Sequence, residues 1–164
     1  MSTASPAAPA ATAAVITPEQ LLEHWQGHRR LTRRIIEAFP EDQLFTFSIG
    51  GMRTFGVLAM ELLSMALPTV KGVVSNEWET SWDRSELPKD EILRRWDRDT
   101  EEMNRLWAQI PPERFQEHLV AFGQYPGPAY SLILYVIDNE IHHRGQGYVY
   151  LRALGVEPSP FFER

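Results

Sequence analysis

The chain has 164 residues, enough for one domain with a buried core, and its 22 acidic and 16 basic residues give a formal net charge of −6. This excess of negative charge argues against non-specific binding to nucleic acid, which depends on clustered positive charge. Because the sequence contains no cysteine, disulfides, zinc–thiolate sites and cysteine nucleophiles are excluded. A metal ion would have to be held by histidine, carboxylate, amide or water.

Residues 1–16 are rich in alanine and proline, and we expect them to form a disordered tail ahead of a single domain at residues 17–164. The tail lacks the basic start and the strongly apolar segment of a signal peptide. No uninterrupted apolar run reaches the length of about 18 residues that a membrane span needs. The sequence therefore predicts a cytoplasmic protein that does not bind membranes.

The first predicted helix begins at Thr17, because Pro18 at the first helical position and Gln20 at a capping-box spacing follow it. An inward stripe of residues spaced three and four apart runs to Phe39, and Pro40 ends the helix. A cluster of arginines on this helix is interpreted as its solvated outer face. The cluster consists of Arg29, Arg30, Arg33 and Arg34.

Three more helices are predicted, over residues 54–74, 88–110 and 129–154. Pro68 is expected to kink or split the second of them. The segment between the last two helices contains Gly123 and several prolines, and it is predicted to be a loop. Four amphipathic helices with no strand pattern between them predict an all-α four-helix bundle.

Two polar residues interrupt the inward stripe of the fourth helix. Asn139 and His143 lie four residues apart, so both side chains project from one helical face and can converge on one point. This is the geometry with which a helix supplies two ligands to a metal ion, although asparagine is a poor ligand for transition metals.

Glu61 is the only ionisable side chain between Phe55 and Val70 in the second helix. A buried carboxylate without a partner is costly, so Glu61 requires a metal ion, a protonated histidine or an arginine beside it. If the second and fourth helices pack face to face, His143 is that partner. The residues alone leave two interpretations open, a metal site or a plain hydrogen bond between Glu61 and His143.

Other histidines are also possible ligands. His28 occupies the inward stripe of the first helix and is interpreted as a core or cleft residue, with a metal-binding role as the alternative. His142 is turned by about 100° from His143 around the helix axis and serves as a reserve ligand. His118 is predicted to lie in a loop without a role.

Two segments resemble the DinB/YfiT-like family. Residues 138–155, with the string HRGQ at 143–146 followed by YLR and LG, look like the C-terminal helix of that family. Residues 53–56, with the sequence RTFG, resemble the start of its second helix. The resemblance covers nearly all of the chain after residue 17.

The resemblance implies a DinB-like four-helix bundle that forms a homodimer and holds a divalent metal ion, Zn or Ni, through three histidines. One histidine comes from the second helix and two come from the fourth, in the order HxxxH. His143 matches the last of these ligands, whereas Asn139 and Glu61 stand where the family has histidines. The predicted metal ligands are therefore His143, Glu61 and Asn139, with His142 or His28 as replacements for Asn139.

Some relatives of this fold transfer a low-molecular-weight thiol to a small electrophile, and their metal lowers the pKa of the thiol. The leading hypothesis is therefore a metal-dependent thiol S-transferase or hydrolase, with its catalytic residues unassigned. The alternative is a non-catalytic, dimeric stress-response or small-ligand-binding protein with a metal-free site. In that case the three polar residues form a hydrogen-bond network.

Overall fold

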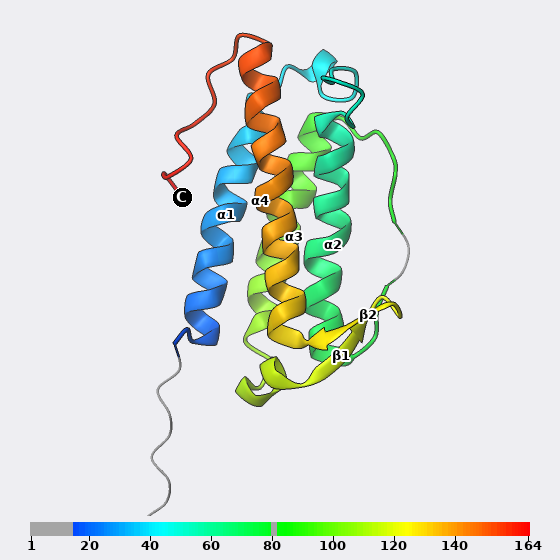
Figure 1. The fold of residues 1–164 in the computed structure, drawn as a ribbon, viewed down its shortest axis with the longest axis vertical. Helices are drawn as coiled ribbons and strands as arrows, with labels where there is room; N and C mark the ends of the chain where they lie inside the picture. The colour runs from blue at the N-terminus through cyan, green and yellow to red at the C-terminus, as the bar shows by residue number, and fades with distance from the viewer. Residues whose placement is uncertain (1–14, 80–81) are drawn as a thin grey trace, which may run out of the picture.

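The structure, a computed structural model, describes residues 15–79 and 82–164. Within these ranges four long helices lie side by side, and a two-stranded hairpin closes one end (Figure 1). The helices are α1 (Pro18–Ala38), α2 (Phe55–Ser75), α3 (Lys89–Trp107) and α4 (Ala129–Ala153). The strands are β1 (His118–Ala121) and β2 (Tyr125–Pro128), and the short 3-10 helices are η1 (Glu41–Gln43) and η2 (Pro112–Gln116).

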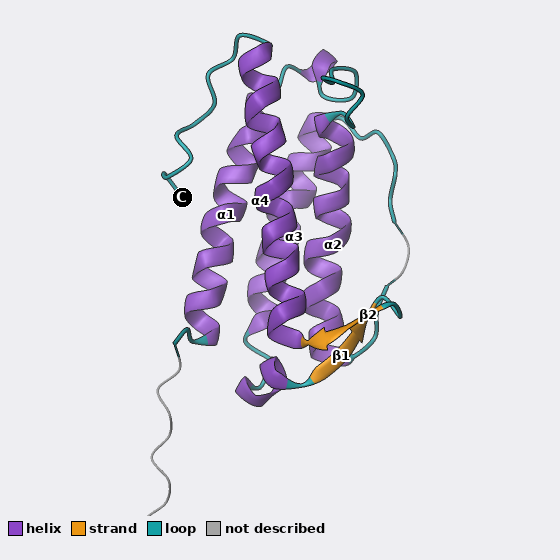
Figure 2. Cartoon of the chain, in the orientation of Figure 1, coloured by secondary structure: helices purple, strands orange, loops and turns teal. Residues whose placement is uncertain are grey.

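The four helices form a square in which α1 and α2 each pack against α3 and α4. α1 and α4 run in one direction and α2 and α3 in the other, because the described parts of the long connection after α2 return along the bundle before α3 begins (Figure 1). Nearly all regular structure belongs to the bundle (Figure 2). The predicted all-α four-helix fold is confirmed.

The ends of the helices follow the local signals in the sequence. Thr17 and Gln20 form the predicted capping box, with Gln20 N donating to Thr17 Oγ1 at 3.2 Å and Thr17 N donating to Gln20 Oε1 at 2.9 Å. The first 14 residues of the predicted tail lie outside the described ranges. α2 continues through Pro68, so the helix is not split there, and the alternative of a kink stays a prediction. Packing of α2 against α3 and α4 offsets the backbone hydrogen bond that a proline removes.

The prediction of a loop between α3 and α4 is also wrong, because residues 118–128 form the antiparallel hairpin of β1 and β2. His118, predicted to lie in that loop, begins β1. Glycine and two prolines make up most of β2, and these residue types usually signal a loop. The only strand-like signal is the alternation in β1, where Leu119 and Ala121 are buried.

α2 is long and apolar enough to cross a membrane, with a mean hydropathy of 1.6 over its most apolar window. However, 67% of that window is buried inside the bundle, where α2 packs against α3 and α4. This burial is typical of the central helix of a globular bundle.

A polar layer crosses the middle of the bundle between two apolar clusters. One cluster contains Trp25, Met65 and Val136, and the other contains Phe55 and Tyr150. Every long helix contributes to both clusters, and α1, α3 and α4 place buried polar side chains between them. The buried polar members of the layer are His28, Arg29, Thr32, Asp99, Glu140, His143 and Arg144.

The most buried part of this layer is an ionic network around Glu140 of α4, which is 1% exposed. Thr32 Oγ1 donates to Glu140 Oε1 at 2.6 Å, and Trp25 Nε1 donates to Glu140 Oε2 at 3.2 Å. Arg29 Nη1 lies 4.0 Å from Glu140 Oε2, and the Arg29 guanidinium stacks 4.0 Å above the ring of Trp96. Burial raises the pKa of Glu140, and the positive charge of Arg29 opposes that change.

The prediction that Arg29 lies on a solvated face is therefore wrong, since its side chain is 1% exposed. α1 packs against both α3 and α4, so its buried face is wider than the single stripe that periodicity indicates. The network fixes α4 against α1 and thereby sets which side chains of α4 face α2.

Replacing Glu140 with glutamine should lower the free energy of unfolding by about 3 kcal/mol, because Arg29 then stays buried without its counter-charge. Urea denaturation followed by circular dichroism measures this change. The matched control is Glu101→Gln on the exposed face of α3, which should shift stability by less than about 0.5 kcal/mol. Equal stabilities for the two variants would contradict the assignment of Glu140 to a structural ion network.

Candidate functional site

α2 and α4 pack face to face and bring Glu61 and His143 together. The close approach depends on Gly147, one turn after His143, because a Cβ atom there would lie 2.5 Å from the Phe55 ring. Glu61 Oε1 lies 2.9 Å from His143 Nε2. The His143 side chain is 5% exposed and that of Glu61 is 21% exposed. The contact that the helical spacing predicts is therefore present, at the edge of the bundle's polar layer.

Asn139 lies one turn before His143 and joins the same group. Its Nδ2 atom is 3.3 Å from Glu61 Oε1 and 3.2 Å from the sulfur of Met65. In this orientation the amide donates to the carboxylate, so Asn139 contributes a hydrogen bond to Glu61.

Arg53, which precedes α2, completes the group. Its Nη1 donates to Glu61 Oε2, and its Nη2 lies 3.4 Å from His143 Nε2. The Tyr150 hydroxyl donates to the backbone carbonyl of Arg53 at 2.9 Å and holds this segment against α4. The guanidinium thus contacts both the acid and the imidazole, while the Arg53 side chain as a whole is 51% exposed.

These contacts favour the ionised form of Glu61. The hydrogen bond from His143 lowers the pKa of the carboxyl to about 2, assisted by Arg53 and opposed by partial burial. Glu61 is therefore a carboxylate at neutral pH, with its charge compensated by side chains of the chain itself.

The arrangement does not fit a resident zinc or nickel ion. The described residues contain no group of three or more histidine, aspartate or glutamate side chains that could hold a metal. The two residues best suited to bind a metal, Glu61 and His143, both contact the Arg53 guanidinium. His143 Nδ1 is buried without a hydrogen-bond partner among the described residues, whereas a metal-bound histidine normally donates its second N–H to an oxygen. The metal role of His143, Glu61 and Asn139 stays a prediction.

The two reserve ligands have other surroundings. His142 is exposed, and its Nε2 lies 2.9 Å from Gln146 Nε2. His28 is buried on α1, where Arg144 Nη2 lies 3.0 Å from its Nδ1 and Arg164 Nη1 lies 3.0 Å from its Nε2. Both nitrogens of His28 therefore face arginine side chains, away from Glu61.

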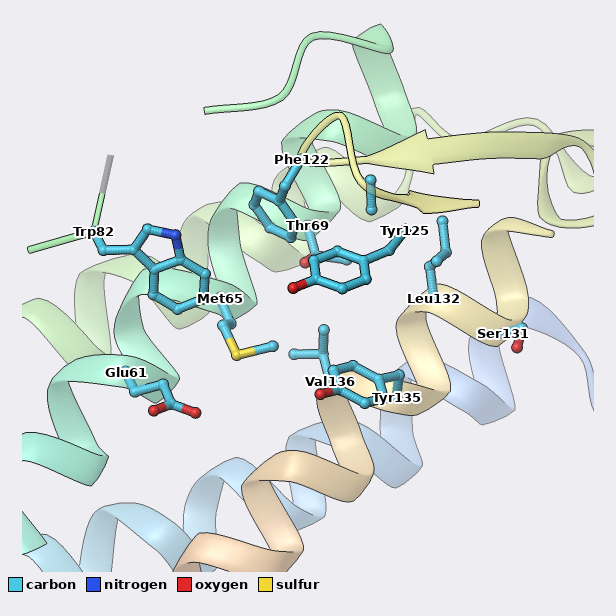
Figure 3. A pocket seen from close by; sticks show the side chains of 11 residues that line it. Glu61, Met65, Thr69, Trp82, Phe122, Tyr125, Ser131, Leu132, Tyr135 and Val136 are labelled. Atoms are coloured by element: carbon cyan, nitrogen blue, oxygen red, sulfur yellow. The ribbon is translucent and has the colours of Figure 1, made fainter. Parts of the chain in front are cut away.

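A cavity of about 330 Å³ opens beside Glu61 between α2, α4 and the hairpin (Figure 3). Trp82, Phe122, Tyr125 and Tyr135 surround it, and Met65 lies between them. A second cavity of about 380 Å³ lies on the other side of Glu61 and Trp82. Its lining includes Arg53, Asp83 and Arg84. Glu61 thus separates an aromatic cavity from a charged one, and the first has the size and lining of a small-molecule site.

Sequence reasoning missed two parts of this site. Arg53 lies before the first residue of α2, so helical periodicity gives no indication of its direction. The available signal is the requirement that Glu61 have a cationic partner, and arginine is one residue that can meet it. Three of the aromatic residues, Trp82, Phe122 and Tyr125, come from a connection and a hairpin whose structure the sequence did not indicate.

Comparison with known proteins identifies the chain's relatives. The sequence profile of the DinB family matches residues 10–164. The fold is similar to that of a DinB-like protein from Bacillus cereus ATCC 10987, with a TM-score of 0.71 and 19% identity over 87% of this chain and 95% of that one. A DinB-like protein of Bacillus subtilis, YjoA, gives a TM-score of 0.68 and 18% identity over 88% and 99%. No curated protein matches the sequence.

The buried His28 should make stability sensitive to mild acid. Burial, with Arg144, His24 and Arg164 nearby, lowers its pKa from 6.5 to about 4. The unfolded chain therefore takes up a proton before the folded chain does, and stability falls as pH drops from about 6.5 to about 4. Between pH 7 and pH 4.5, the free energy of unfolding of His28→Gln should fall by about 2 kcal/mol less than that of the wild type. Urea denaturation at the two pH values measures this difference.

The exposed His118 provides the control for this measurement. His118→Gln should retain the full loss of stability seen in the wild type. If His28→Gln and the wild type lose the same stability between the two pH values, His28 does not resist protonation in the folded state.

Proposed function

Because this chain belongs to the DinB family, we propose that it binds a small organic molecule and that its polar centre works without a resident metal ion. The observation that carries this proposal is the position of Arg53. Its guanidinium contacts both Glu61 and His143, the two residues best able to bind a metal, beside a cavity lined by aromatic side chains.

Charge balance supports a centre without metal. A carboxylate in a partly buried position requires a cation, and the Arg53 guanidinium meets that requirement. The hydrogen bonds from His143 and Asn139 to Glu61 Oε1 satisfy the other carboxylate oxygen. Glu61 is then a fixed negative group at the end of the aromatic cavity.

The same contacts favour binding over acid–base chemistry. His143 Nε2 faces Glu61 and its Nδ1 is buried, so neither nitrogen is placed to take a proton from a molecule in the cavity. A carboxyl group with a pKa of about 2 is a weak base at neutral pH. In this proposal His143 positions Glu61, and Glu61 orients the bound molecule.

The second candidate is the metal-dependent enzyme, a thiol S-transferase that uses a low-molecular-weight thiol and a small electrophile, or a hydrolase. The observation that favours it is the exposure of Arg53, whose side chain is half in solvent. If Arg53 turned outward, Glu61 and His143 would be free to hold a divalent ion, with Asn139 beside them. This candidate requires Arg53 to leave both side chains, whereas in the metal-free proposal Arg53 can stay paired with Glu61.

Cytoplasmic location and homodimer formation belong to the proposal as well. The burial of α2 in the bundle core supports a protein that works outside the membrane. The dimer is an expectation from family resemblance, and sedimentation equilibrium of the tag-free protein tests it.

Metal analysis separates the two candidates. Tag-free protein should contain far less than one equivalent of zinc or nickel by elemental analysis, and adding either ion should change its melting temperature by less than about 1 °C. Arg53→Met should gain about 5 °C or more with zinc, because Glu61 and His143 become available as ligands.

Two further variants control for zinc bound elsewhere. In the Arg53→Met background, His143→Ala should abolish the gain and His118→Ala should preserve it. If the wild type instead carries one equivalent of metal and loses stability when a chelator removes it, the metal-dependent enzyme replaces the present proposal.

A further inference from the structure

The aromatic cavity beside Glu61 has a distinct chemical character. Exposed aromatic side chains gather around it, with Trp82, Tyr125 and Tyr135 between 44% and 65% exposed. They come from the connection before α3, from the hairpin and from α4 (Figure 3). Such a concentration of exposed rings at one concave place is typical of a binding site.

Phe122 shows that the hairpin is shaped to provide one of these rings. Its backbone has a φ of 53°, a left-handed conformation that is uncommon for a bulky residue. The ring packs against Trp78 at 5.4 Å and Trp82 at 6.1 Å between centroids, and it lines the cavity. The strained turn places an aromatic wall where a glycine or asparagine would fit the backbone with less strain.

The charge of the lining is negative. Glu61 is the one carboxylate among the described lining residues, and none of them is lysine, arginine or histidine. Arg53 lines the neighbouring cavity, on the other side of Glu61. A bound molecule in the aromatic cavity that reaches its polar end therefore meets the carboxylate.

From these observations we infer that the cavity binds an organic cation, an amine with an apolar body. Its ammonium group donates to Glu61, and its apolar body contacts Trp82, Phe122 and Tyr135. The electron-rich faces of the rings attract a cation, and the carboxylate adds charge complementarity. This inference rests on the proposed small-molecule function and specifies the class of ligand.

Arg53 competes with a bound cation for the Glu61 carboxylate. Its guanidinium pairs with Glu61 Oε2, so a bound ammonium must share the carboxylate or displace Arg53. Because the Arg53 side chain is half exposed, it can move into solvent at low cost. Removing Arg53 should therefore strengthen cation binding, whereas a ligand anchored by Arg53 would lose affinity.

Three probes with one apolar body and different charges test the inference, namely naphthylmethylamine, naphthylmethanol and naphthylacetate. Isothermal titration of the full chain at pH 7 should give the amine an affinity about tenfold above that of the alcohol, with the carboxylate weakest. Glu61→Gln should remove the preference for the amine, and Arg53→Met should increase it severalfold. Glu157→Gln, on an exposed residue, is the matched control and should change neither affinity.

Binding of all three probes should weaken in Phe122→Ala, which removes a wall of the cavity. Circular dichroism confirms the fold of each variant, and Arg53→Met provides an independent test if Glu61→Gln fails to fold. Equal affinities for amine and alcohol, or a carboxylate preference that Arg53→Met abolishes, would overturn the inference and leave the small-molecule function standing. Failure of all three probes to bind would overturn both.

Discussion

A single acid in an otherwise apolar stretch of α2 sets the main constraint on this site. Glu61 lies on the helix that packs deepest in the bundle, and a carboxylate there must be compensated by positive charge or by hydrogen bonds. Arg53, His143 and Asn139 provide that compensation from the segment before α2 and from α4. The negative charge of Glu61 is balanced within this group, which is why we propose that the centre works without a metal ion.

The position of this group depends on a second cluster of polar residues on the same helix. α4 presents two faces within one short sequence, with His143 facing Glu61 on α2 and Glu140 and Arg144 facing α1. The Arg29–Glu140 network therefore fixes the rotation of α4, and Gly147 allows α4 to approach α2 closely. Structural and functional polar residues alternate along α4, and both belong to the layer that divides the two apolar clusters.

The sequence predicted those features that depend on local patterns. The capping box at Thr17, the helix stripes and the Glu61–His143 contact follow from spacing and from the requirement that a buried acid has a partner. Features that depend on tertiary packing were missed. Periodicity indicates one buried stripe on α1, whereas two helices cover it and bury Arg29. The prolines and glycine of β2 are typical of a loop, so the sequence gives little sign of the hairpin. Helical periodicity also gives no indication of where the Arg53 side chain points, because Arg53 precedes α2.

The DinB fold can thus carry a centre whose cation is an arginine side chain, beside a cavity that aromatic residues make suitable for a ligand. The central claim is that Arg53, His143 and Asn139 hold Glu61 as a carboxylate without a metal ion. A pH titration of the Glu61 side-chain carboxyl carbon by NMR, in chelator-treated protein, tests it most directly. We expect the group to stay ionised far below 4.5, with a pKa of about 2, and to be unaffected by removal of metal. A midpoint at or above 4.5 in the metal-free protein would contradict the account.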